Sequence, residues 1–230
     1  MPYLRDTAFI LKKEPVNEHD RRYILYGRDH GLLTAVARGT SLRTSKQAGH
    51  LEPFTEAEIM IAKGRAWDKL AVARNVSEEG VVRFQLRTIG AMAVMGAFCD
   101  LVASLTRSGV CDARIYDLIK DTRLACVKMD SVASSTRASF IFSGSALKLL
   151  DLLGYAPIAN ESINQDVRKL VAFARKFPLT EALRITAAPI VFNEFSYFVE
   201  SALSHAPLEK KPHGFKTVSV IASPSRGVAI

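Results

Sequence analysis

The sequence has few of the residues that build disulfide frameworks and metal sites. Its 230 residues include three cysteines, Cys99, Cys111 and Cys126, and no Cys-x-x-Cys spacing. An odd number of cysteines without paired spacing fits a reducing cytoplasm and argues against both a disulfide framework and a zinc ribbon. The five histidines are scattered, without the His-x-x-x-His or His-Glu-x-x-His spacing of a metal site. We therefore expect no metal and no cofactor.

Long apolar runs are absent as well. Residues 1–13 contain Arg5, Asp6 and two lysines and carry no apolar core of the kind that a secretory signal has. The most apolar stretch, Ile89–Thr106, is interrupted by Asp100, and its uninterrupted part is shorter than the roughly 20 residues that a membrane span needs. A buried core helix is the better interpretation, and we expect a cytoplasmic protein without a membrane partner.

Catalytic motifs are missing too. The chain has no Gly-x-x-x-x-Gly-Lys phosphate loop, which argues against an ATP-driven activity. Ser143-Gly144-Ser145 lies within a helical pattern and lacks the strand–turn–helix context of a nucleophile elbow. Cys99 and Cys126 lie among apolar residues, where a cysteine is more typical of a core than of a nucleophile. We predict that the protein is not an enzyme.

The composition that is present predicts a globular protein with an anionic partner. Hydrophobic residues make up 48% and charged residues 23%, which is enough apolar material for a packed core. The formal net charge is +8 at pH 7. Nucleic acid is the first candidate partner, because lysine and arginine neutralise phosphates and release counterions.

The first third of the chain predicts short strands separated by turn signals. The predicted strands cover Tyr3–Lys12, Arg22–Gly27, Leu32–Ala37, Glu56–Ala62 and Trp67–Val76. Gly31 ends the turn that begins at Arg28, and glycine supplies the positive φ that such a tight turn needs. Five short strands at this spacing predict a small antiparallel barrel or sandwich and suit an OB-fold, a five-stranded Greek-key barrel.

After a polar break at residues 77–80, apolar residues recur at helical spacing. The predicted helices cover Val81–Leu105, Asp112–Met129, a run from Ser134 or Ser135 to Leu153, Gln165–Phe177 and Pro189–Ser204. Asp112 is the expected N-cap of the second helix, and Gly154 followed by Pro157 is the expected end of the third. Residues 207–230 are expected to be loop-like and partly flexible.

These patterns predict an α+β protein with two domains. Residues 1–79 form an OB-fold β-barrel that binds nucleic acid, and residues 80–230 form an all-α helical domain that binds partners. Residues 1–80 carry 13 lysines and arginines against 11 acidic residues, whereas residues 81–230 carry 18 against 12. The barrel is therefore not basic on average, although between Arg21 and His50 six basic residues are opposed by a single acidic one.

The turn before the last predicted strand combines an aromatic ring with cations. Lys63, Arg65 and Lys69 surround Trp67, and the loop between strands four and five is a customary ligand loop of OB-folds. A ring beside cations offers stacking together with phosphate contacts, which binds single strands without reading sequence. The predicted DNA-binding residues are Arg21, Arg22, Arg38, Arg43, Lys46, Arg65 and Trp67. The alternative interpretation places Trp67 in the barrel core and leaves the arginines at the strand ends simply solvated.

Several stretches occur in a fixed order over most of the chain. They are Asp29-His30-Gly31-Leu32, Arg38-Gly39, Ser45-Lys46, Gly49, Leu51, Pro53-Phe54, Asp112-Ala113-Arg114-Ile115-Tyr116-Asp117-Leu118-Ile119 and Leu149-Leu150-Asp151-Leu152-Leu153-Gly154-Tyr155-Ala156-Pro157. Their order and spacing resemble the RecO family of bacterial recombination mediators. The likeness weakens after about residue 165.

The resemblance implies an OB-fold followed by a helical domain in a nucleoid-associated protein of DNA repair and recombination. It implies binding of single-stranded and duplex DNA, annealing of complementary strands, and help in exchanging single-stranded-DNA-binding protein for RecA. The implied protein partners are RecR and the acidic C-terminal tail of single-stranded-DNA-binding protein. Many relatives carry a four-cysteine zinc site just after the Tyr-x-Pro stop. Here Ile158–Gln165 contains no cysteine, so we expect no zinc.

An acidic, hydrophobic tail needs apolar walls and a cation for its terminal carboxylate. The candidate partner-binding residues, which lie on or beside amphipathic helices, are Arg114, Arg123, Lys128 and Arg137. Solvated helix faces would carry the same pattern. Two other functions stay open from the sequence: an RNA-binding OB module related to translation, and an adaptor that binds proteins only.

Overall fold

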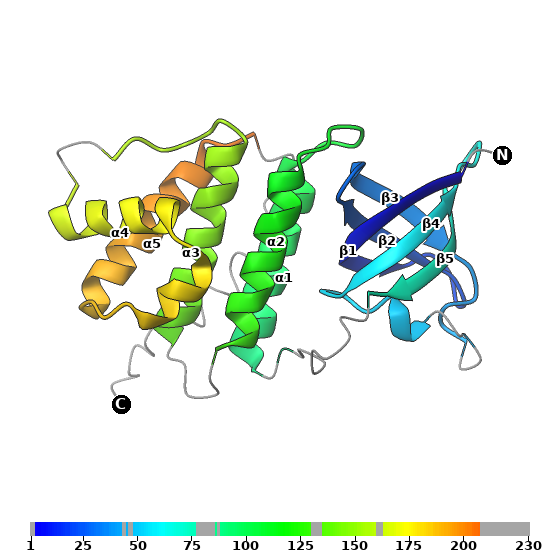
Figure 1. Cartoon of the computed structure of the whole chain (residues 1–230), viewed down its shortest axis with the longest axis horizontal. Helices are drawn as coiled ribbons and strands as arrows, with labels where there is room; N and C mark the ends of the chain where they lie inside the picture. The colour runs from blue at the N-terminus through cyan, green and yellow to red at the C-terminus, as the bar shows by residue number, and fades with distance from the viewer. Residues whose placement is uncertain are drawn as a thin grey trace, which may run out of the picture. The chain divides into compact units, whose positions relative to one another are not determined.

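The computed structural model describes residues 3–42, 45, 48–76, 86, 88–129, 135–159 and 163–207 (Figure 1). The chain divides into two compact units. The first comprises Met1–Arg83 with Thr106–Tyr116, and the second comprises Phe84–Leu105 with Asp117–Ile230. All five strands belong to the first unit, and most of the helical residues belong to the second.

The strands of the first unit close into a barrel. They are β1 (Tyr3–Pro15), β2 (Arg21–Gly27), β3 (Gly31–Ala37), β4 (Glu56–Ala62) and β5 (Lys69–Asn75), and they neighbour one another in the order β1-β2-β3-β5-β4 (Figure 1). The pairs are antiparallel except β3 and β5, which pair in parallel at Val36 and Lys69. This strand order is that of an OB-fold, so the predicted fold class is confirmed. A short 3-10 helix, Ala48–His50, lies between β3 and β4.

The core of the barrel follows from the alternation of side chains along each strand. On β3, for example, Leu33, Ala35 and Ala37 are buried while Thr34 is exposed. β1 pairs with β2 along one edge and with β4 along the other, and its register shifts between Ile10 and Lys12. Such a bulge bends a strand, which helps a single long strand to take part in closing a barrel.

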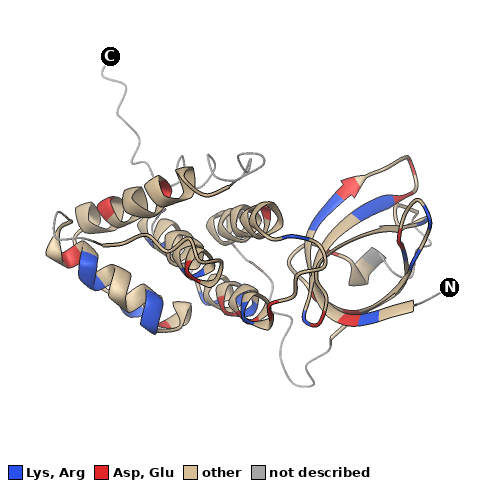
Figure 2. Cartoon of the chain, turned by 90° about the horizontal axis from the view of Figure 1, so that it is seen from above, with Lys and Arg blue, Asp and Glu red and all other residues tan. Residues whose placement is uncertain are grey.

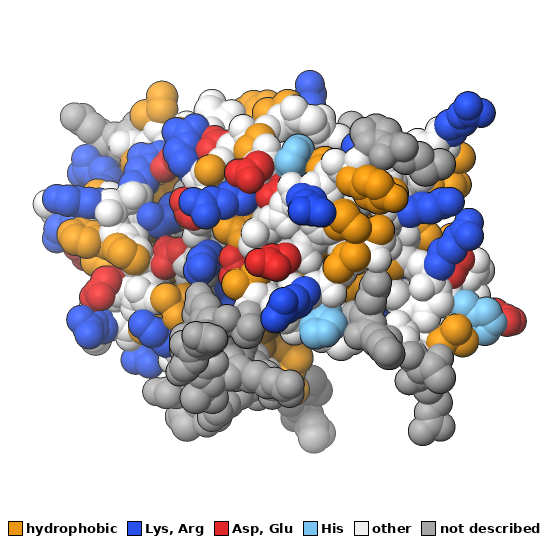
Figure 3. Space-filling model, turned by 45° about the vertical axis from the view of Figure 1, so that its right-hand side comes forward, with side chains coloured by type: hydrophobic (Ala, Val, Ile, Leu, Met, Phe, Trp, Pro, Cys, Tyr) orange, Lys and Arg blue, Asp and Glu red, His pale blue; other side chains and the backbone are white. Residues whose placement is uncertain are grey.

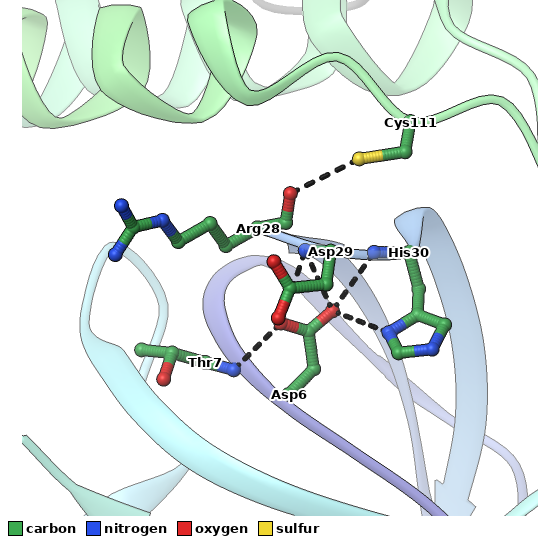
Figure 4. A network of polar contacts seen from close by, with 6 residues as sticks. All are labelled: Asp6, Thr7, Arg28, Asp29, His30 and Cys111. Atoms are coloured by element: carbon green, nitrogen blue, oxygen red, sulfur yellow. Dashed lines mark hydrogen bonds and ion pairs between the residues drawn. The ribbon is translucent and has the colours of Figure 1, made fainter.

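A buried carboxylate holds the turn between β2 and β3 (Figure 4). Asp6, whose side chain is fully buried, accepts hydrogen bonds from the backbone N–H groups of Thr7 (2.7 Å), Asp29 (3.2 Å) and His30 (3.1 Å). Its Oδ2 also lies 3.0 Å from Nδ1 of His30. Gly27 leaves the space for this carboxylate, because a Cβ there would lie 2.1 Å from Asp6 Oδ2. The charge of Asp6 is thus compensated by donors from the turn that it organises.

Residues 106–116 pack on the same unit although they are remote in sequence from its strands. The Tyr26 hydroxyl donates to the Asp112 carbonyl (3.2 Å), and the Cys111 thiol donates to the Arg28 carbonyl (3.0 Å; Figure 4). Tyr116 donates to the Glu56 carboxylate, and its ring lies 5.0 Å from that of Phe9. The barrel domain predicted at residues 1–79 does not include this segment.

The second unit is built around one central helix. Its elements are α1 (Ile89–Leu105), the greater part of α2 (Ala113–Val127), α3 (Ser135–Leu152), α4 (Gln165–Lys176), the 3-10 helix η2 (Leu179–Arg184) and α5 (Pro189–Ser204). α3 contacts α1, α4, η2 and α5. Small buried hydroxyls line the contact of α3 with α5: Ser139 and Ser143 of α3 lie 2.9 and 3.1 Å from Ser196 of α5. Basic residues mark α4 in Figure 2, whereas the charged residues of α5 are acidic.

Most predicted helix ends agree with the structure. Asp112 caps α2 through a hydrogen bond from Arg114 N (2.9 Å), and Gly154 has the positive φ (81°) of a helix C-cap, so both predictions are confirmed. The predicted start at Val81 lies outside the described residues, but the prediction that Leu86 and Thr88 are helical is wrong, because α1 begins at Ile89. The reason is Thr88, whose hydroxyl accepts the Ala91 N–H at 3.0 Å and so caps the helix. Within the described residues, no helix is long and apolar enough to cross a membrane.

Gly31 supports a sharp test of how residues 106–116 pack against the β2–β3 turn. Gly31 and Gly109 both have positive φ (65° and 81°), so an alanine at either position costs about 1–2 kcal/mol of backbone strain. At Gly31 the new Cβ would also lie 2.2 Å from the Val110 carbonyl oxygen, whereas at Gly109 it would meet nothing within 4 Å. We expect Gly31→Ala to lower the free energy of unfolding by about 1–3 kcal/mol more than Gly109→Ala, measured by urea denaturation. Equal losses would contradict the close approach.

Candidate nucleic-acid interface

An open pocket of about 160 Å³ lies on the barrel where β3 pairs with β5. Its lining comes from the β1–β2 connection, β2, β3 and its C-terminal end, the β4–β5 loop and the start of β5. The lining residues are Val16, Asp20, Arg22, Val36, Arg38, Trp67 and Lys69. The Val36 N–H donates to the Asp68 carbonyl at 2.9 Å, which fixes the β4–β5 loop against β3. Strands two and three with these two loops form the customary ligand face of an OB-fold.

Trp67 is the sole tryptophan of the chain and lies in the β4–β5 loop. It is 60% exposed, so the interpretation that places it in the barrel core is wrong. The prediction that it begins the last strand is also wrong, because β5 starts at Lys69. The guanidinium carbon of Arg22 lies 5.4 Å from the centre of the Trp67 ring, within the range of a cation–π interaction. The pocket therefore presents an exposed aromatic surface beside a cation.

The β4–β5 loop is shaped by one carboxylate and one glycine. Asp68 accepts hydrogen bonds from Lys63 Nζ (2.7 Å) and Gly64 N (3.2 Å). Burial acts to raise the pKa of Asp68, but the hydrogen bonds from Lys63 and Gly64 outweigh it and the pKa is lowered. A Cβ at Gly64 would lie 2.0 Å from the Trp67 carbonyl oxygen, so glycine is required for this tight turn. The loop thereby holds Trp67 out from the barrel surface.

The β1–β2 connection is ordered by two short polar side chains. Asn17 Oδ1 accepts the N–H groups of His19 (2.9 Å) and Asp20 (2.7 Å). Asp20 accepts hydrogen bonds from Asn17 Nδ2 at 3.0 Å and from Gly39 N at 2.9 Å. The hydrogen bond from Asn17 and then that from Gly39 lower the pKa of Asp20, with a smaller contribution from the charge of Arg38. Asp20 is therefore an ionised carboxylate at neutral pH, and it joins the connection to the chain that leaves β3.

The electrostatics of the barrel are local. Basic and acidic positions are interspersed around it in Figure 2, and the face drawn in Figure 3 mixes both signs among apolar side chains. At the pocket, however, Arg22, Arg38 and Lys69 are opposed by Asp20 alone among the lining residues. Arg22 also lies 3.9 Å from the Glu14 carboxylate, whereas Arg38 and Lys69 are exposed. The pocket is thus a positive site on a barrel of nearly balanced charge.

The structure brings together three of the predicted DNA-binding residues, Arg22, Arg38 and Trp67, in the lining of this pocket. Arg21 lies beside it and donates to the carbonyls of Asn17 (2.9 Å) and Asp20 (3.1 Å). Arg65 is exposed in the β4–β5 loop but is not among the lining residues. Arg43 and Lys46 lie outside the described residues, so their assignment stays a prediction.

Four lining residues were not in the predicted set: Val16, Asp20, Val36 and Lys69. The sequence did point to Lys69 as a site residue, because it is a cation two positions from Trp67. Val36 had a weaker signal, because it is an apolar residue at an outward position of β3. Asp20 gave none, because an acidic residue argues against a phosphate site when it is considered alone.

The four predicted partner-binding residues divide between the two units, and their assignment stays a prediction. Arg114 belongs to the first unit, where its side chain forms an ion pair with Asp112 at 2.7 Å. Arg123, Lys128 and Arg137 belong to the second unit; Arg123 is half-buried, whereas the other two are exposed.

An apolar depression in the second unit lies between α3, α4 and η2. Its residues include Phe140 and Gly144 of α3, and Phe173 of α4 stacks on Phe177 with ring centres 4.8 Å apart. It is too small to hold a water molecule. In the described part of the chain, no three histidine, cysteine or acidic residues gather as a metal site would require.

Comparison with known proteins shows which protein family this chain resembles. Residues 1–78 match the family model described as the N-terminal domain of recombination protein O, RecO_N. A DNA repair protein RecO from Rubrobacter xylanophilus is 30% identical over 157 residues, and one from Pelotomaculum thermopropionicum is 28% identical over 158. These alignments cover 68% and 69% of this chain but 60% and 58% of the relatives, which is less than two thirds of their length. A RecO from Bifidobacterium longum is 26% identical over 223 residues, covering 91% of this chain and 89% of the relative.

The exposure of Trp67 can be measured directly because the chain has no other tryptophan. We expect red-shifted emission from the folded protein and acrylamide quenching that is substantial but below that of the urea-unfolded chain, because Trp67 is 60% exposed. Arg22→Ala should increase quenching further, because it removes the cation that lies over the ring. Arg74→Ala, which removes an exposed cation of β5 that does not line the pocket, is the matched control and should leave quenching unchanged. Blue-shifted, weakly quenched emission would place Trp67 in a core.

Proposed function

Because this chain belongs to the RecO family, we propose that it is a non-enzymatic recombination mediator that binds single-stranded DNA in the barrel pocket. The observation that carries this proposal is the joining of Trp67 with Arg22, Arg38 and Lys69 in one lining. A base stacks on the indole, and neighbouring phosphates contact the exposed cations. This combination binds a strand without reading its sequence.

The pocket suits a single strand better than a protein ligand. All of its residues come from strands two and three, the two ligand loops, or the adjoining ends of the strands, which is the surface that OB-folds use for oligonucleotides. The 60% exposure of Trp67 leaves ring surface for a base. Duplex DNA keeps its bases stacked inside the helix, so it would contact the cations without using the indole.

Annealing of complementary strands requires no active site. Cations lower the repulsion between two phosphate backbones, and binding through stacking and phosphate contacts leaves hydrogen-bonding edges of the bases available. We therefore propose that the protein anneals complementary strands without ATP. We also propose that the protein acts with RecR and helps RecA to replace single-stranded-DNA-binding protein on the strand.

The binding test compares pocket variants over a salt series. Arg38→Ala and Lys69→Ala should each weaken binding of a labelled single-stranded oligonucleotide, followed by fluorescence anisotropy. Each lost phosphate contact should also reduce the slope of log K against log salt by about 0.7. Trp67→Ala should cost about 1–3 kcal/mol through lost stacking, with little change in the slope. Arg74→Ala, outside the pocket, is the control that should behave as wild type.

The alternatives predict other outcomes of this titration. A preference for RNA over DNA of the same sequence would favour an RNA-binding module. Absence of salt-dependent binding to either nucleic acid would favour an adaptor that binds proteins only. Wild-type affinity in Arg38→Ala, Lys69→Ala and Trp67→Ala would reject the pocket as the DNA site.

For the acidic tail of single-stranded-DNA-binding protein, we propose a site in the second unit that uses Lys128 and Arg137. Both are exposed cations, whereas the charge of Arg114 is already compensated by Asp112. Reversing the charge at Lys128 or Arg137 should weaken binding of a tail peptide at least several-fold by anisotropy, because a terminal carboxylate loses its cation. Arg184→Glu, which reverses an exposed cation of η2, is the control. Unchanged affinity at Arg114, Arg123, Lys128 and Arg137 would reject all four assignments.

A further inference from the structure

The barrel pocket separates two kinds of surface. Val16, Val36 and Trp67 supply apolar walls, while Arg38 and Lys69 are exposed cations. Asp20, also in the lining, is negatively charged and would repel a phosphate placed inside the pocket. The backbone of a bound strand is therefore directed to the exposed cations, and the space inside the pocket suits an uncharged base.

The size of the pocket limits which base enters. Its volume is about 160 Å³. For comparison, an apolar protein cavity of about 150 Å³ accommodates one benzene molecule. The pocket thus has room for a single six-membered ring, which is the size of a pyrimidine, whereas a bicyclic purine would extend out of it.

Asp20 gives the pocket a directional hydrogen-bond preference. Its Oδ1 accepts from Gly39 N and its Oδ2 accepts from Asn17 Nδ2. A carboxylate has about four lone-pair sites, so two remain for a ligand, and it has no hydrogen to donate. The hydrogen bonds from Asn17 and Gly39 lower the pKa of Asp20, which keeps it an acceptor near neutral pH.

We infer that this pocket takes one unstacked pyrimidine and prefers cytosine, whose 4-amino group donates a hydrogen bond to Asp20. Uracil and thymine carry a carbonyl oxygen at the same position, which Asp20 repels. The inference rests on the proposed function, since it names the base that enters the same site. The protein still binds other sequences through Trp67 and the cations, but with lower affinity.

The first experiment compares oligo-dC and oligo-dU of equal length, about 12 nucleotides, within the range that one OB-fold covers. These bases differ only at the 4-position and in the protonation of N3. A mildly alkaline buffer keeps cytosine neutral. Titration of the wild-type chain, followed by Trp67 fluorescence, should give about ten- to a hundredfold tighter binding to dC, the scale of one hydrogen bond to a charged acceptor.

Two variants separate the acceptor role of Asp20 from its role in ordering the loop. Asp20→Asn removes the carboxylate, but its amide nitrogen would face Asn17 Nδ2 and disturb the connection. The double variant Asn17→Asp with Asp20→Asn exchanges the two side chains, which restores a donor–acceptor pair at that contact and leaves the net charge unchanged. The amide at position 20 then donates to the carboxylate at position 17 and accepts from Gly39 N, so position 20 offers the pocket no carboxylate. We expect the double variant to bind dU at least as tightly as the wild type, because the carboxylate that repels the 4-carbonyl is gone, and to lose the preference for dC.

The outcomes distinguish this inference from the proposed function. Equal affinity of the wild type for dC and dU would overturn the inference alone. A preference for dC that persists in the double variant would overturn it as well, because Asp20 would not be its source. Failure of the wild type to bind either oligonucleotide would overturn the proposed function and the inference with it.

Discussion

The parallel pairing of β3 with β5 is the contact on which the candidate site depends. Four of the five strand pairs are antiparallel, and three of these join strands that follow each other in sequence. β1 pairs with β4 across a longer stretch of chain, and the parallel pair of β3 with β5 closes the sheet into a barrel. Closure removes the exposed strand edges that would otherwise pair with other chains. It also places Trp67, which precedes β5, beside Arg22 of β2. The pocket is therefore a product of closure and belongs to no single strand.

Polar side chains then fix the loops around the closed barrel, each by satisfying backbone N–H groups. Asp6 holds the β2–β3 turn, Asp20 holds the β1–β2 connection to the end of β3, and Asp68 holds the β4–β5 loop. A buried or half-buried carboxylate is stable here because several donors surround it. Two of these loops carry pocket residues, so the acidic residues that reduce the net charge of the barrel also order its binding surface.

Patterns within a few residues of sequence were enough to predict most strands and helices and part of the candidate site. Gly31, Asp112 and Gly154 marked turns and helix ends because glycine conformation and capping act within a few residues. Arg22, Arg38 and Trp67 could be proposed from charge clustering along the chain. The adjacency of Val36 and Lys69 could not, because it arises from pairing between strands distant in sequence. For the same reason no local signal indicated that residues 106–116 pack with the strands.

That segment has a consequence for the order in which the first unit is completed during synthesis. All five strands are synthesised before Asp112 and Tyr116, yet Tyr26 and Glu56 find hydrogen-bond partners in those later residues, 86 and 60 positions away in sequence. Until then the ring of Phe9, fully buried in the finished structure, lacks its neighbour Tyr116. Contacts of such separation form late and slow folding. The barrel therefore carries an uncovered apolar surface until residues 106–116 join it, and exposed apolar surface of this kind makes an incompletely folded chain prone to aggregation.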